Sequence, residues 1–104
     1  MTAEYQLVFQ LRGSSQLDFE EMIALEGELR SGIGELGEVD GHDVGQGQMN
    51  VFVLTPSPIR CFERVRLLPG FARAMPRLKV AFRPLDGDGY EVLHPPGLSS
   101  FTVT

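Results

Sequence analysis

The side chains best suited to binding a ligand are concentrated in the stretch DGHDVGQGQ at positions 40–48. Carboxylates and imidazoles ligate metal ions, and glycine-rich loops let backbone amides approach a phosphate. A Walker loop also needs a lysine ahead of a helix, whereas this stretch has no lysine and precedes a strongly apolar run. Three metal ligands within four residues need more distant partners to complete a coordination shell. We predict no metal and no cofactor, and we treat as a candidate ligand or partner loop the residues Asp40, His42, Asp43, Gly45, Gln46 and Gly47.

Cys61 is the only cysteine, so the chain cannot form an internal disulfide, as is typical of proteins in a reducing compartment. A nucleophilic thiol would need a lowered pKa, with His42 or His94 as its base. Val65 and Leu68 follow Cys61 at helical spacing and favour a structural position beside an apolar stripe. No Gly-x-Ser-x-Gly motif supports a serine nucleophile. We predict that the chain is not an enzyme and that it is cytoplasmic.

The net charge of −5 repels phosphate backbones, yet seven of the nine basic residues lie between positions 60 and 83. Arg60 and Arg64 are candidates for a basic patch, and the alternative is a solvated helix face that offsets nearby glutamates. RNA-recognition modules carry a basic-aromatic signature on a central strand, and QMNVFVLT (48–55) has no basic residue. No apolar run approaches the roughly 18 to 20 residues of a membrane span, and the N-terminal charges are not those of a secretory signal. We predict binding to neither nucleic acid nor membrane.

Alternation of apolar and polar residues predicts strands at 4–12, 48–55 and 77–85. The short polar segment 35–40 is typical of an edge strand. The glycines between this segment and residue 48 are explained as residues that permit positive φ in a hairpin loop or a bulge. A turn at DGDG (86–89) allows YEVLH to return as one more short strand.

Helical spacing of apolar residues predicts two helices, at 17–31 and 58–68. Ser15 or Asp18 caps the first helix, and two glycines follow its end. The second helix begins with Pro58 at its first position and ends at Pro69-Gly70. Helical spacing also includes Phe19 and Ile33 in the apolar stripe of the first helix. The core candidates are Leu7, Phe9, Leu11, Met22, Ile23, Leu29, Val51, Val53, Phe62, Val65, Val80 and Phe82.

The resulting order β-α-β-β-α-β predicts an α+β sandwich, an antiparallel sheet with two helices on one face and an optional extra hairpin at the C-terminus. This pattern resembles the ferredoxin-like superfold, including its ACT-like regulatory members. The segments VDGHDVGQGQMNVFVLTPSPIRCFERVRLLP (39–69) and VAFRPLDGDGYEVLHPPG (80–97) are similar to those of small uncharacterised bacterial proteins of that fold. We expect a single domain over residues 1–97 and a tail at 98–104. The resemblance describes architecture and implies no catalytic residue.

A scaffold without a catalytic constellation favours a non-enzymatic protein-interaction or regulatory module that binds a protein partner. The alternative is an ACT-like domain that senses an amino acid or another metabolite at a dimer interface, beside Gly45 and Gly47. The strand 48–55 has apolar residues on both faces, so the face away from the helices needs a cover. Leu98, Phe101 and Val103 of the tail are one candidate cover, and a second copy of the chain is the other. We predict a homodimer.

Overall fold

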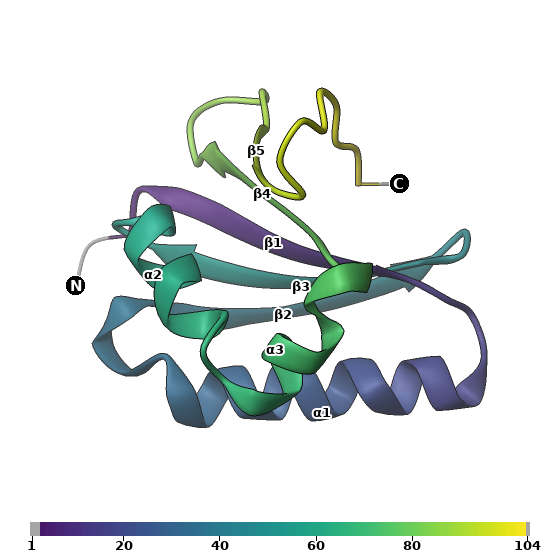
Figure 1. The fold of residues 1–104 in the computed structure, drawn as a ribbon. Coiled ribbons are helices and arrows are strands. Elements are labelled where there is room, and N and C mark those ends of the chain that lie inside the picture. Colours follow the sequence, from purple (N-terminus) through teal and green to yellow (C-terminus); the bar gives the residue numbers. More distant parts are fainter. Residues whose placement is uncertain (1–2, 104) are drawn as a thin grey trace.

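The sheet has a central strand, β1, and the helices pack on one of its faces (Figure 1). The structure is a computed structural model that describes residues 3–103. Its strands are β1 (Tyr5–Arg12), β2 (Glu38–Gly45), β3 (Gln48–Thr55), β4 (Lys79–Pro84) and β5 (Glu91–His94). Its helices are α1 (Gln16–Gly32), α2 (Pro58–Val65) and α3 (Pro69–Ala74), with short 3₁₀ turns η1 (Gly34–Leu36) and η2 (Met75–Arg77).

The predicted α+β class with an antiparallel sheet is confirmed, and the strand order is β2-β3-β1-β4-β5. The optional fifth strand is present and pairs with β4. The prediction of two helices is wrong, because the segment after α2 forms a third helix, α3. Pro69 was expected to stop a helix, but it occupies the first turn of α3, where its missing N–H costs no hydrogen bond. No helix within residues 3–103 is long and apolar enough to cross a membrane.

The core lies between the sheet and the helices, and it contains most of the predicted residues. Alternate residues of β1, Leu7, Phe9 and Leu11, point toward the helices and are buried. Two core predictions need correction: Ile23 is 39% exposed, and Phe82 is only half-buried at the edge of the cluster. The other predicted core residues are buried: Met22, Leu29, Val51, Val53, Phe62, Val65 and Val80.

α1 begins at the predicted cap but is rotated relative to the predicted packing face. The Ser15 hydroxyl accepts a hydrogen bond from the Asp18 backbone N–H at 3.1 Å, and the Asp18 carboxylate accepts one from the Ser15 N–H at 3.1 Å. Leu25 and Glu26 are buried on this helix, while Phe19 and Ile23 are 36% and 39% exposed. Apolar residues occupy more than one face of α1. Packing against the sheet and α3 therefore determines which of them are buried.

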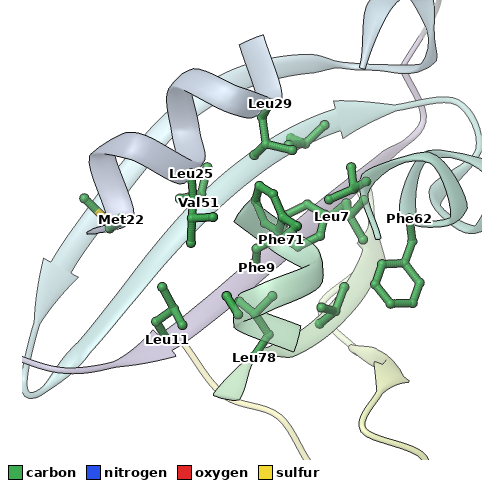
Figure 2. Close-up of a cluster of buried hydrophobic side chains, with 14 of the residues drawn as sticks. Leu7, Phe9, Leu11, Met22, Leu25, Leu29, Val51, Phe62, Phe71 and Leu78 are labelled. Carbon is green, nitrogen blue, oxygen red and sulfur yellow. The ribbon is translucent and has the colours of Figure 1, made fainter. Parts of the chain in front are cut away.

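α3 completes the core with Phe71, the largest fully buried side chain in the described residues. The Phe71 ring packs edge-on against the Phe9 ring, with centroids 5.2 Å apart (Figure 2). The Glu28 carboxylate on α1 accepts hydrogen bonds from the backbone N–H groups of Gly70 at 2.9 Å and Phe71 at 3.1 Å. These contacts satisfy two donors at the N-terminus of α3 and join it to α1.

The tail crosses the face of the sheet that the helices leave open (Figure 1). Gln10, on this face of β1, donates from Nε2 to the Thr102 backbone oxygen at 2.9 Å, and the rings of Tyr90 and Phe101 lie 5.0 Å apart. Val8 and Ala81 on the same face are fully buried. The chain therefore covers much of this face by itself, which is the first of the two covers that the sequence allowed.

Candidate functional site

The candidate loop at 40–48 is a strand and a tight turn. β2 extends to Gly45, and Gln46 and Gly47 form a two-residue connection with φ of 53° and 74°. Such a connection needs positive φ at both positions, which glycine supplies freely and Gln46 adopts at a small cost. Gly41, with φ of 125°, lies at a bulge where the pairing of β2 with β3 shifts by one residue. Most of the predicted candidate loop is therefore strand, and the edge strand lies later than the predicted 35–40. The predicted positive φ in a hairpin turn and a bulge is confirmed at Gly47 and Gly41.

The pleat of β2 separates the side chains that were considered as metal ligands. His42 points toward α1, where its Nδ1 lies 3.1 Å and 3.2 Å from the two carboxylate oxygens of Glu26. Asp43 pairs in register with Asn50 and faces the opposite side of the sheet. Asp40 is the extra residue at the bulge. Within residues 3–103, no group of three His, Cys, Asp or Glu side chains is arranged to hold a metal ion.

His42 and Glu26 form a polar contact at the rim of the core, which sequence reasoning missed. Glu26 is 7% exposed, and the Arg30 guanidinium lies 3.8 Å from its carboxylate. The Phe19 ring packs edge-on against the His42 ring, with centroids 6.1 Å apart. A glutamate in the middle of an amphipathic helix is usually exposed, so only the approach of β2 explains why this one is buried.

Neither histidine is placed as a base for Cys61. His42 is engaged by Glu26, and His94 contacts the Met75 backbone oxygen through Nε2 at 2.8 Å. The Cys61 thiol is fully buried in the core, and burial raises its pKa to about 11, an effect that the Thr55 hydroxyl partly offsets. This geometry matches the structural role predicted for the cysteine.

We expect the Cys61 thiol to resist modification while the protein is folded. A thiol with a pKa near 11 has about one hundredth of the thiolate at pH 8 that a free cysteine has, and burial blocks the reagent as well. The reaction with a chromogenic disulfide at pH 8 is therefore expected to be at least about a hundredfold slower than that of free cysteine. In guanidinium chloride the rate should equal that of free cysteine. A fast reaction of the folded protein would contradict the burial.

The two arginines of the predicted basic patch, Arg60 and Arg64, are exposed on α2. Glu63 lies between them in sequence and pairs with Arg66 at 3.5 Å. The charges on this helix are therefore mixed, and the Phe62 ring packs under the Arg66 guanidinium, whose carbon lies 5.5 Å from the ring centroid.

The edge of the sheet at β2 combines features that sequence reasoning did not bring together. Among the described residues, 3–103, β2 pairs only with β3, so one side of its backbone is free of strand pairing there. Three apolar side chains remain exposed beside it: Phe19 by 36%, Ile23 by 39% and Val44 by 46%. We call this region the β2 edge surface, formed by strand β2 together with Phe19 and Ile23 of α1.

The members of the β2 edge surface are neighbours in space. His42 and Val44 share the helix-facing side of β2, and Phe19 contacts the His42 ring. Ile23 lies one turn after Phe19 on α1. Strand β2 also carries Glu38, Asp40 and Asp43 and has no lysine or arginine. The surface is therefore an open strand edge with an apolar side and an acidic character.

Comparison with known proteins gives no relative for this chain: no protein-family model, curated protein or solved structure matches it.

Proposed function

We propose that this protein is a non-enzymatic interaction module that binds an extended segment of a partner protein along the free edge of β2. The observation that carries the proposal is the unpaired strand edge flanked by the exposed apolar side chains Phe19, Ile23 and Val44. A free edge presents backbone donors and acceptors that another strand can pair with, and side-chain pockets beside it supply specificity.

The charge of β2 specifies the chemistry of the partner segment. Glu38, Asp40 and Asp43 would repel an acidic strand and attract one that alternates basic and apolar residues. Pairing of two β2 edges about a twofold axis would bring the same three acidic side chains of both copies together. A basic partner strand therefore suits this edge better than a second copy of the chain does.

Titration of the labelled protein with the acetylated peptide Lys-Val-Lys-Val-Lys-Val tests the proposal by two-dimensional NMR. We expect saturable shifts of the amides of residues 38–45, and no saturation with the Glu-Val counterpart. The double variant F19S/V44S should weaken binding about tenfold, because it removes the apolar contacts and leaves the backbone edge intact. The matched control I59S/L67S removes two exposed apolar side chains elsewhere and should bind like the unmodified protein.

Two results would overturn this proposal. One is a saturable response that lies away from β2 or survives F19S/V44S unchanged. The other is a dimer in sedimentation equilibrium at micromolar concentration that F19S/V44S dissociates, since a second copy would then occupy the edge. The homodimer expected from the sequence stays a prediction, but the exposed face on which it rested is largely covered by the tail.

We also propose that β1 to β4 form a ferredoxin-like unit that β5 extends at one edge. Two features support this: the order β2-β3-β1-β4 within the sheet, and the position of the helical segments after β1 and after β3. The additional strand and the division of the second helical segment into α2 and α3 are the departures from the simple pattern.

A further inference from the structure

A pocket of about 270 Å³ lies where β1 ends and β4 begins, and its lining is strongly basic for a protein of net charge −5. The lining residues are Gln10, Arg12, Arg77 and Lys79. Three of the nine basic residues of the chain therefore line one small pocket. Two of them, Arg12 and Lys79, come from segments far apart in the sequence.

The sheet register explains why three of these side chains meet, and the turn before β4 brings the fourth. Gln10 and Lys79 are directly paired across β1 and β4, so their side chains share one face. Arg12 follows Gln10 by two residues on the same face. Arg77 lies in the 3₁₀ turn η2, just before β4, and its guanidinium binds Glu21 of α1. Gln10, Arg12 and Lys79 thus share one face of the sheet, and Arg77 lines the pocket from η2.

Arg77 and Gln10 are fixed by contacts to the rest of the protein. The Arg77 guanidinium binds both carboxylate oxygens of Glu21, at 2.9 Å and 2.6 Å. Gln10 donates from Nε2 to Asn50 at 2.9 Å and to the Thr102 backbone oxygen at 2.9 Å, and it is 5% exposed. These two residues form fixed walls of the pocket, and Glu21 balances the charge of Arg77.

Arg12 and Lys79 supply the uncompensated positive charge. Both side chains are exposed, and neither forms an ion pair with any carboxylate in residues 3–103. Like charges held close together on one sheet face repel each other, and an anion between them relieves that repulsion. The guanidinium fork of Arg12 suits two oxygens of a carboxylate or phosphate, and Lys79 suits a single oxygen.

We infer that this pocket binds a small organic anion, an oxyanion group of the carboxylate or phosphate type on a body about the size of one ring. The volume is below that of typical drug-sized sites, which limits the ligand to a few more atoms than the anion itself. The methylene stems of Arg12 and Lys79 can cover the apolar body while their charged ends hold the oxyanion. This inference stands on its own residues and does not depend on binding at β2.

Titration of the labelled protein with phenyl phosphate, benzoate and neutral benzamide tests the inference. We expect saturable shifts of the amides of residues 10–12 and 77–79 with one or both anions, and none with benzamide. The relative affinity of phenyl phosphate and benzoate identifies the preferred oxyanion. The variant R12Q/K79Q should weaken binding about tenfold or more, because it removes both uncompensated charges.

The matched control is R60Q/R64Q, which removes the same total charge from α2, outside the pocket. It should bind the anions within about twofold of the unmodified protein, since only the net charge has changed. Equal weakening in the two variants would show a general charge effect and overturn the site, as would shifts that do not saturate at millimolar anion. Both variants change exposed side chains, so their urea midpoints should match that of the unmodified protein and confirm folding.

Discussion

Replacing Phe71 with alanine is expected to reduce the free energy of unfolding by about 3–5 kcal/mol, the range found for buried Phe→Ala changes. The Phe71 ring is fully buried, packs against Phe9 and belongs to a helix of only six residues. Such a short helix has little stability of its own, so its position depends on this side chain and on the Glu28 carboxylate at its N-terminus. The loss is a large part of the roughly 5–15 kcal/mol that holds a typical domain folded.

Urea denaturation followed by far-UV circular dichroism measures this effect, with Phe19→Ala as the matched control. The Phe19 ring is 36% exposed, so its truncation removes less buried area and should cost about 1–2 kcal/mol. A cost below about 1 kcal/mol for Phe71→Ala would contradict the structure, because α3 would then lie outside the cooperative core.

Replacing Thr55 with valine is expected to cost about 2 kcal/mol, although valine has nearly the same shape. Thr55 is fully buried at the end of β3, and its hydroxyl donates to the Leu36 backbone oxygen at 2.6 Å. The Thr55 hydroxyl oxygen also accepts a hydrogen bond from the Ser57 backbone N–H at 3.0 Å, just before α2. Valine leaves both backbone groups without this partner, and an unsatisfied buried polar group costs more than the bond itself contributes.

Thr55→Ser is the control, because serine keeps the hydroxyl and loses only a methyl group. We expect Thr55→Ser to cost about 1 kcal/mol, the value of a buried methylene, and to be clearly more stable than Thr55→Val. A second measurement is the pKa of the Cys61 thiol, which the Thr55 hydroxyl lowers and which should rise further in Thr55→Val. Equal stability of the two variants would show that these hydrogen bonds do not contribute to the fold.

The two proposed binding surfaces lie on different parts of the sheet, so each can be tested independently of the other. The β2 edge surface is acidic and apolar, whereas the pocket at Arg12 and Lys79 is basic. A variant of one surface is therefore the natural negative control for the other. Binding of peptide should be unaffected by R12Q/K79Q, and binding of small anions should be unaffected by F19S/V44S.

Local sequence pattern determined the elements wherever one physical signal was strong. The strands predicted from alternation at 4–12 and 48–55 are confirmed as β1 and β3, as is the start of α1 at Ser15, because pleat and cap act over two to four residues. The prediction that glycines permit positive φ in a hairpin loop or a bulge is confirmed at Gly47 and Gly41, whereas the extension of β2 to Gly45 has only a weak signal in its polar residues. Pro69 was misread because proline both ends one helix and begins another.

Only the tertiary structure decided which residues are covered and which side chains meet. α1 carries more apolar residues than can pack against the sheet. Leu25 is therefore buried, and Phe19 and Ile23 remain partly exposed at the edge. Glu26 is buried because β2 brings His42 to it across the rim of the core. Arg12 and Lys79 are 67 positions apart in the chain, and no local pattern relates them. They share a pocket because the register of β1 with β4 is set by the pairing of whole strands against a buried core.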